Sequence, residues 1–385
     1  MKTAVIVDCV RTPIGRAHPE RGFFRDVRGD DLCVACVEAL VQRTGIDPLQ
    51  IEDVILGNTQ QTLEHGMNAA RTIGLMAGLS METGGTTVNR LCGSSLQALH
   101  QAVHAIAAGA EDVHVVGGFE HMHHVPMDHG FDVNPKLFRV TSRAALHMGA
   151  TAEFLAQTHS ISRADQDAFA LRSHRLASRA YEAGEFQPEL VPVFGRDEQG
   201  NRMLVQRDQC VRGDTSLEAL AALEPAFMPR GGTVTAGNSS PLNDGAAAML
   251  VMSESKAREL GLKPLVRVRA TAVAGLAPAV MGLGPIPAAR KALARAGMSL
   301  KDIDLIEINE AFAVQTLACV RGLDLELDRV NIRGGAIALG HPLGASGARI
   351  MTTLIHALVA RQANVGLAAM CIGLGQGIAT IVERV

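Results

Sequence analysis

Two stretches of this chain share one plan, in which a turn of small residues leads into an apolar-faced helix and then a strand. In the first half, "LCGSSLQALHQAVHAI" (91–106) precedes "DVHVVGG" (112–118). In the second half, "LGASGARIMTTLIHALVA" (343–360) precedes "VGLAAMCIG" (365–373). Strands that alternate with helices favour a parallel or mixed α/β sheet. The recurrence predicts a duplicated unit that brings two loops together at one site.

The chain divides into segments of different character. Residues 1–118 carry the helix and strand alternation, whereas residues 119–243 are rich in histidine, methionine, proline and polar turns. The alternation returns at residue 244. We therefore predict a first core half from 1–118 with 244–264, an inserted lobe from 119–243 that covers a site, and a second core half from 265–385.

Charge and composition exclude several classes of protein. The chain has 36 lysines and arginines, 39 acids and a net charge of −3, with one tyrosine, no tryptophan and no basic stripe, so nucleic acid is not an expected partner. No signal peptide or bilayer-spanning run is visible, which predicts a cytoplasmic protein with seven free thiols. "GLGQG" near the end fails the dinucleotide-loop spacing, so no nucleotide cofactor is expected.

Three glycine-rich segments carry candidate chemistry. Cys92, in "NRLCGSS", stands at the start of a predicted helix, where the helix N-terminus lowers a thiol's pKa and leaves a reactive thiolate. His341, in "GGAIALGHPLGASG", is the side-chain type best suited to act as base for such a thiol. Cys371, in "AAMCIGLGQG", ends a predicted strand. The alternative for either cysteine is a small buried apolar residue.

Other polar groups have two interpretations or a structural one. Asn309, in "EINEAFA", stands between a strand and a helix, where it either caps the helix or helps to form an oxyanion hole. The "CVAC" pair at 33 and 36 is interpreted as helix core. "EHMHHVPMDHG" (120–130) holds four histidines without a regular spacing or a carboxylate pair, so it predicts a lid or protein contact and no metal site.

Five ordered motifs resemble the thiolases: "VNRLCGSSLQA", "TVTAGNSSPLNDGAAAM", "NEAFA", "GGAIALGHPLGASGAR" and "CIGLGQG". The resemblance runs from "RTPIG" to the C-terminus, and "EHMHHVPMDHG" is most similar to the 3-ketoacyl-CoA thiolase β subunits of bacterial fatty-acid β-oxidation complexes. It implies a five-layered αβαβα core of two similar halves, with 119–243 as a loop domain that binds coenzyme A. The chain departs from that subfamily at His123, Asn238 and Glu224.

The resemblance also implies roles. Cys92 would be the acyl-thioester nucleophile, His341 its base, Cys371 the second acid/base, and Asn309 would hold a water in an oxyanion hole. The residues implied to bind coenzyme A, which is a substrate and not a cofactor, are Arg212, Ala236, Ser240, His147, Met148 and Gly373. The implied assembly is a homodimer, with a hydratase/dehydrogenase α subunit as a further partner in a heterotetramer.

Three other activities compete with cleavage of 3-ketoacyl-CoA. A biosynthetic acetoacetyl-CoA thiolase uses the same residues to join two acetyl-CoA molecules. A 3-ketoacyl synthase of the same fold class lacks the Cys371 motif. A non-catalytic CoA-binding carrier does not need the set formed by Cys92, His341 and Cys371.

Overall fold

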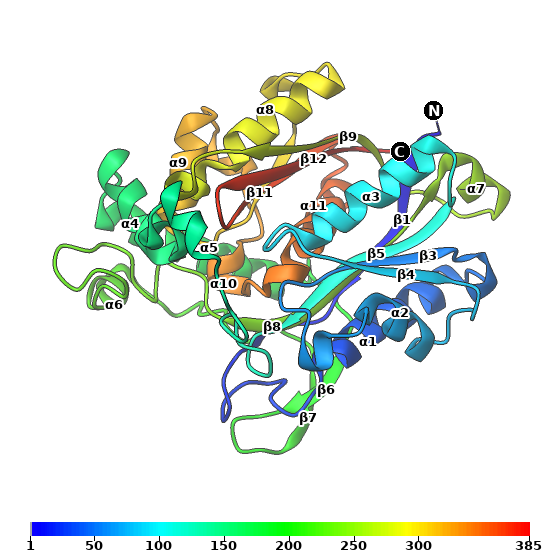
Figure 1. Ribbon diagram of the computed structural model, residues 1–385, viewed down its shortest axis with the longest axis horizontal. Helices are drawn as coiled ribbons and strands as arrows, with labels where there is room; N and C mark the ends of the chain where they lie inside the picture. The colour runs from blue at the N-terminus through cyan, green and yellow to red at the C-terminus, as the bar shows by residue number, and fades with distance from the viewer. Residues whose placement is uncertain (1) are drawn as a thin grey trace.

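Two groups of β-strands, one from each half of the chain, face each other across two central helices in the computed structural model, which describes residues 2–385 (Figure 1). The first group has the order β1–β8–β5–β3–β4, and the second has the order β9–β12–β11–β10. The two groups join at one edge, where Val5 and Ile6 of β1 pair with Arg267 and Val266 of β9. The strands are β1 (Ala4–Arg11), β2 (Gly15–Arg16), β3 (Asp53–Gly57), β4 (Gly84–Val88), β5 (Val113–His121), β8 (Asn243–Ser253), β9 (Val266–Gly275), β10 (Leu305–Ile308), β11 (Val365–Ile372) and β12 (Gln376–Arg384).

The strand pairings confirm the predicted duplication. In the first half β1 is antiparallel to β8, β8 is antiparallel to β5, and β5 is parallel to β3. In the second half β9, β12, β11 and β10 repeat these three pairings in the same order and sense. The first half adds β4 as a parallel strand at its outer edge.

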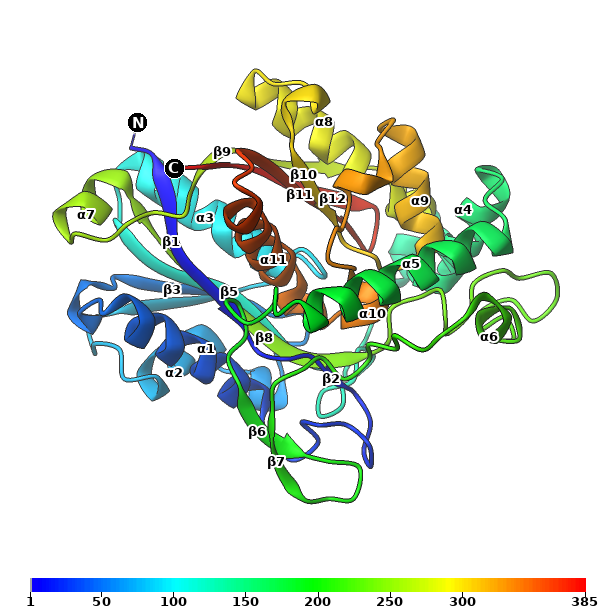
Figure 2. The same ribbon diagram turned by 180° about the vertical axis from the view of Figure 1, so that it is seen from behind.

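Helices form three layers around the two sheets (Figure 2). The central helices α3 and α11 share one apolar cluster with both sheets. One further cluster lies under the outer helices of the first half, and another under those of the second half. These layers confirm the predicted five-layered αβαβα architecture. The central helices are α3 (Ser94–Ala108) and α11 (Ser346–Arg361), and the outer helices are α1 (Gly29–Thr44), α2 (Ala69–Met76), α8 (Pro285–Ala296) and α9 (Ala313–Gly322).

Two expectations about apolar residues concern these layers. Cys33 and Cys36 are fully buried in the cluster under α1, as predicted for core residues, and all seven cysteines are free thiols. The segment Leu343–Arg361 is long and apolar enough to cross a membrane, but 83% of its apolar window is buried. Its place between two sheets explains its composition, because a helix in a central layer is apolar on all sides.

The inserted lobe lies between β5 and β8. Strand β5 continues to His121, where it still pairs with Asp244 of β8, so regular pairing extends three residues past the predicted boundary at 118. The predicted capped helix is present as α5, with the capping box formed by Ser162 and Asp165. The lobe's elements are α4 (Met148–Thr158), α5 (Arg163–Glu182), β6 (Val193–Arg196), β7 (Arg202–Val205) and α6 (Leu217–Ala221); the short helices α7 (Glu254–Glu259) and α10 (Ala336–Leu339) lie outside it.

The two central helices begin close together. The backbone N–H of Ala348, in the first turn of α11, donates to Ser95 Oγ, in the first turn of α3, at 2.8 Å. A Cβ on Gly347 would lie 2.6 Å from the Leu96 nitrogen. Because glycine permits this close approach, the loops that precede the two helices meet at one place.

Candidate active site

Cys92 lies on a tight turn immediately before α3. Leu91 has φ 46°, a left-handed conformation that is strained for leucine, and Gly93 is the N-cap of the helix. A Cβ on Gly93 would lie 2.5 Å from the Ile372 side chain, so the turn packs against the end of β11. The turn therefore holds the thiol of the first half against the sheet of the second.

The pKa of Cys92 differs from the sequence prediction. Burial raises the pKa of its thiol to about 11, although the backbone N–H groups of Gly373 and of Cys92 itself lower it. The prediction that the helix N-terminus leaves a thiolate is therefore wrong for the protein without substrate, because loss of solvation outweighs it. A neighbouring base must remove the proton.

Cys371 occupies the second-last position of β11 and is 2% exposed. Burial raises its pKa well above the ordinary value, and the nearby Cys92 and Cys319 thiols raise it further. A Cβ on Gly373, two residues later, would lie 3.2 Å from the Leu91 side chain and 3.5 Å from Met148 Sδ. The structure thus brings together Cys92, Cys371, Gly373 and Met148.

His341 is 5% exposed, and its hydrogen bonds favour one tautomer. Its Nδ1 lies 2.6 Å from Ser346 Oγ, and that hydroxyl donates its hydrogen to the Pro342 carbonyl at 3.1 Å. Ser346 Oγ must therefore accept from Nδ1–H, which leaves Nε2 unprotonated. Burial, with the charge of Arg349, lowers the pKa of His341 to about 3. The ring is consequently a neutral base with a free lone pair on Nε2.

Asn309 lies beside the His341 ring. Its Nδ2 is 3.3 Å from Nε2 and 3.5 Å from Nδ1, and its Oδ1 accepts from Arg349 Nη2 at 3.4 Å. Helix α9 begins only at Ala313, with Phe312 as the N-cap, so the helix-capping alternative for Asn309 is wrong. The Arg349 contact turns the amide N–H₂ toward His341, where it can donate to a developing oxyanion.

Residues that sequence analysis missed hold the His341 loop in place. The His341 N–H donates to Asn243 Oδ1 at 2.8 Å, and Asn243 Nδ2 donates to the Gly15 carbonyl at 2.8 Å. Asn243, Ser346 and Arg349 all lie within the quoted motifs "PLNDG" and "LGASGAR". Their presence there was the available signal, but their partners are distant in sequence and depend on the fold.

The residues expected to bind coenzyme A lie mostly on the lobe. Arg212, Ala236 and His147 are exposed, while Ser240 and Met148 are half-buried. The Ser240 N–H donates to the Ala311 carbonyl at 3.0 Å, which places the 236–240 loop against the segment after Asn309. Arg212 lies on the loop before α6, and its backbone N–H donates to His174 Nδ1 at 3.2 Å. The binding roles of these residues stay predictions.

The histidine-rich segment after β5 is fixed by hydrogen bonds. The His121 and His124 rings stack with centroids 3.8 Å apart, and their Nε2–H groups donate to the Phe24 and Arg25 carbonyls at 3.0 and 2.8 Å. The sequence shows no carboxylate pair in this cluster, but the fold supplies Glu64, whose Oε1 is 3.1 Å from His124 Nδ1. Glu64, His121 and His124 each place a ligand atom within 4.8 Å of the others, but His121 Nδ1 already accepts from the His124 N–H at 3.1 Å. The absence of a metal here stays a prediction.

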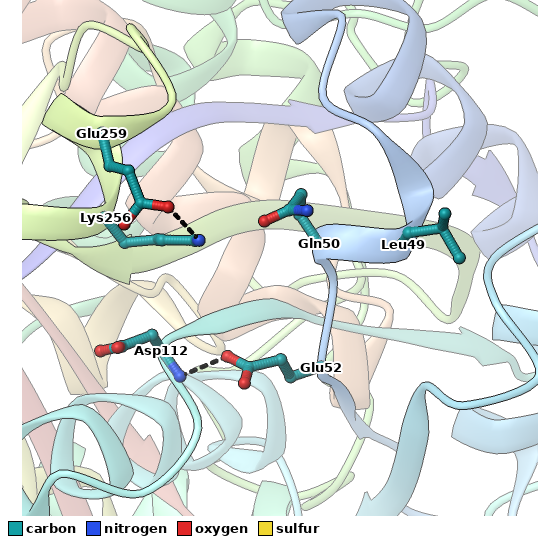
Figure 3. Close-up of a pocket in the computed structure, with 6 residues that line it drawn as sticks. All are labelled: Leu49, Gln50, Glu52, Asp112, Lys256 and Glu259. Atoms are coloured by element: carbon teal, nitrogen blue, oxygen red, sulfur yellow. Dashed lines mark hydrogen bonds and ion pairs between the residues drawn. The ribbon is translucent and has the colours of Figure 1, made fainter.

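A small polar hollow lies at the other edge of the first sheet (Figure 3). Asp112 and Glu52 stand just before β5 and β3, whereas the candidate site lies at the carboxyl ends of these strands. Its charged groups already have partners, as in the Lys256 to Glu259 ion pair at 2.7 Å and the Asp112 N–H to Glu52 bond. The hollow is lined by Leu49, Gln50, Glu52, Asp112, Lys256 and Glu259, and it has no contact with the candidate catalytic groups.

Comparisons with known proteins agree with this geometry. Residues 4–255 match the family "Thiolase, N-terminal domain", and residues 262–384 match "Thiolase, C-terminal domain". The 3-ketoacyl-CoA thiolase of Shewanella frigidimarina is 55% identical over the whole of both chains, and that of Marinomonas sp. is 54% identical over 99% of this chain and 98% of its own. Among solved structures, human mitochondrial 3-ketoacyl-CoA thiolase has a TM-score of 0.92 at 38% identity, and Bacillus anthracis acetyl-CoA acetyltransferase has 0.91 at 40% identity. Each covers 100% of this chain and 99% of its own.

Proposed function

Since this chain belongs to the thiolase family, we propose that it is a 3-ketoacyl-CoA thiolase, an acyltransferase that cleaves 3-ketoacyl-CoA with coenzyme A in fatty-acid β-oxidation. The products are acetyl-CoA and an acyl-CoA shortened by two carbons. Two observations carry the proposal: the Cys92 and Cys371 thiols are neighbours, and the loop that contains His341 meets the start of the Cys92 helix through the Ala348 N–H to Ser95 Oγ bond. One thiol serves as nucleophile and the other as acid/base.

The first half-reaction forms an acyl-enzyme. His341 Nε2 removes the proton of Cys92, and the thiolate adds to the 3-keto carbon. The bond between C2 and C3 then breaks, its electron pair passes to the acetyl-CoA enolate, and Cys371 supplies the proton that gives acetyl-CoA. Asn309 Nδ2–H and the backbone N–H groups near Cys92 are the donors available to the oxyanions.

The second half-reaction regenerates the enzyme. Cys371, now a thiolate, takes the thiol proton of a second coenzyme A, and the resulting thiolate attacks the acyl carbonyl on Cys92. The bond from Cys92 to the acyl carbon breaks, the shortened acyl-CoA leaves, and Cys92 recovers its proton from His341. After both half-reactions, Cys92, His341 and Cys371 have therefore regained their initial protonation states.

The deciding experiment is CoA-dependent cleavage of 3-ketoacyl-CoA over a series of chain lengths, with Cys92→Ser as the control. We expect longer chains to be cleaved and the control to be inactive. Mass spectrometry after incubation without free coenzyme A should show an acyl adduct on Cys92. If no adduct forms on Cys92, the activity is excluded and a CoA-binding carrier becomes the better description.

A biosynthetic acetoacetyl-CoA thiolase is the second candidate. The observation that favours it is the similarity to the Bacillus anthracis acetyl-CoA acetyltransferase, which extends over the whole chain. The same residues catalyse cleavage and condensation, so substrate length separates the two. Reaction with acetoacetyl-CoA alone, and with no longer substrate, would assign the chain to this second class.

The same proposal includes a homodimer in the cytoplasm. Strand β4 is an edge strand, and strongly exposed methionines lie beside it, at Met67 (94% exposed) and Met81 (81%). Exposed apolar side chains next to an unpaired strand edge favour pairing with a second copy. Light scattering after size exclusion should give twice the chain mass, and Met67→Glu should lower it. A hydratase/dehydrogenase α subunit as further partner is tested by co-purification.

A further inference from the structure

Glu120 is a buried carboxylate near the end of β5 to which the reaction above assigns no role. It is 1% exposed and accepts hydrogen bonds from two other segments. Its Oε2 accepts from Thr59 N at 3.0 Å, Thr59 Oγ1 at 2.8 Å and Gly344 N at 2.9 Å. Its Oε1 accepts from Asn58 Nδ2 at 3.2 Å. One side chain thus joins β5, the segment after β3 and the loop that carries His341.

Close backbone packing connects the same segments to Cys92. A Cβ on Gly57 would collide with the backbone of Ser94 and Ser95, in the first turn of the helix that begins after Cys92. A Cβ on Gly344 would lie 2.8 Å from both Asn58 Cα and Glu120 Oε2. The end of β3 therefore contacts the nucleophile's helix through Gly57, and the next residue, Asn58, contacts the histidine's loop.

From this arrangement, and resting on the proposed function, we propose that Glu120 is a positioning residue for acyl transfer. Its carboxylate fixes the His341 loop of the second half to the first half, and thereby aligns Nε2 with the Cys92 thiol. The anchor acts through the Gly344 N–H, three residues from His341. A displacement of about 1 Å at a reacting group costs on the order of 100-fold in rate, so an anchor of this kind affects catalysis strongly.

The charge of Glu120 alone predicts that its removal would make Cys92 more reactive, which is the opposite of the loss expected from a displaced His341 loop. The negative charge of Glu120 raises the pKa of Cys92, so removal of that charge favours the thiolate. Burial raises the pKa of Glu120 itself to about 7, although its hydrogen-bond donors lower it, and His65 Nδ1 lies 3.7 Å from Glu120 Oε1. A loss of activity on removal of Glu120 therefore comes from displaced geometry and not from a weaker nucleophile.

The test is a double-mutant cycle on the first half-reaction. The rate of Cys92 acylation by 3-ketoacyl-CoA is measured by single-turnover mass spectrometry in Glu120→Ala, His341→Ala and the double variant. If Glu120 acts through His341, Glu120→Ala slows acylation about 10- to 100-fold when His341 is present and less than about 3-fold when it is absent. In Glu120→Gln the amide oxygen can take the place of Oε2, so the loss is smaller.

Glu153→Ala is the matched control. Glu153 is also a buried carboxylate, and it accepts from Thr233 N, Thr233 Oγ1 and Val234 N at 2.9 to 3.1 Å, but it does not bind the His341 loop. Its effect on the rate should be the same factor with and without His341. Thermal unfolding checks each variant, and Glu120→Gln replaces Glu120→Ala in the cycle if the alanine variant does not fold.

The outcomes separate the two proposals. If the Glu120 variant slows acylation by the same factor with and without His341, while wild type acylates normally, the positioning role is overturned and the proposed thiolase activity still stands. A wild-type protein that forms no acyl adduct overturns both. Loss confined to the background that retains His341 supports the positioning role.

Discussion

Removal of the Ser346 hydroxyl tests the assignment of His341 as a neutral base with a free Nε2. In Ser346→Ala, the 2.6 Å contact to Nδ1 is lost, and the other neighbour of Nδ1 within residues 2–385, the Asn309 Nδ2 at 3.5 Å, is a donor that cannot accept the Nδ1–H. His341 is 5% exposed, so bulk water has little access to the unpaired Nδ1–H. The ring then samples the other tautomer, in which Nε2 carries the proton and cannot accept one from Cys92.

The magnitude follows from the cost of an unpaired buried donor. That cost is about 1 to 3 kcal/mol, and 1.36 kcal/mol corresponds to a factor of ten in rate, so kcat should fall about 5- to 150-fold. KM should change little, because Ser346 is fully buried and hydrogen-bonded to Pro342 and His341. An equal fall in kcat and kcat/KM, with KM nearly unchanged, is typical of an interaction made only in the transition state.

Steady-state thiolysis of a 3-ketoacyl-CoA measures both parameters. Ser253→Ala is the matched control, because Ser253 is also fully buried and its Oγ accepts from Lys256 N at 3.2 Å, at the far end of β8 from the His341 loop. The two variants should lose similar stability, but only Ser346→Ala should lose most of its kcat. A kcat within a factor of two of wild type, or an equal loss in Ser253→Ala, would refute the tautomer argument.

Three further predictions follow from the same geometry. Cys371→Ala should still form the acyl adduct on Cys92 but turn over poorly, and complete loss of the adduct in mass spectrometry would show that the two thiols are misassigned. Gly118→Ala should lower kcat more than about 10-fold, because a Cβ there collides with the Gly344 carbonyl and displaces the His341 loop; unchanged kinetics would contradict the close packing. Burial lowers the pKa of His100 to about 3, so its contribution to stability is present above about pH 6.5 and is lost as pH falls toward 3, where the unfolded chain binds a proton that the folded one does not. Calorimetry of His100→Asn should therefore show a weaker dependence of Tm on pH between 6.5 and 4, and an unchanged dependence would exclude the effect.

The parts of the fold that could be predicted from sequence are those with a local cause. The small-residue turns before α3 and α11, and the apolar strands after them, repeat within the chain, so the duplicated sheet could be predicted from one sequence. The capping box of α5 depends on two residues three positions apart. The C-x-x-C pair in α1 lies on the buried face of a helix, which its apolar neighbours indicate.

The parts that could not be predicted depend on contacts between segments far apart. Cys92 was expected to have a low pKa because its helix N-terminus is visible in the sequence, but the opposing effect comes from burial against the end of β11. Glu64 reaches His124 from a loop 60 residues earlier, which no spacing rule within "EHMHHVPMDHG" can reveal. The two interpretations of Asn309 were separated only when the start of α9 was known.

The duplicated architecture explains why both halves are needed for one reaction. Each half contributes the start of a central helix and the end of the strand that follows it. In the first half Cys92 lies two residues before α3 and Glu120 is the second-last residue of β5, and in the second half Gly344 and Cys371 occupy the corresponding positions. Equivalent positions thus have different proposed tasks: nucleophile and structural anchor in one half, partner of that anchor and proton donor in the other. Because β1 and β9 join the halves through only two residue pairs, the alignment of the thiol with its base depends mainly on contacts between the central helices and loops. Substitutions at those contacts should therefore impair catalysis more than equally destabilising substitutions under the outer helices.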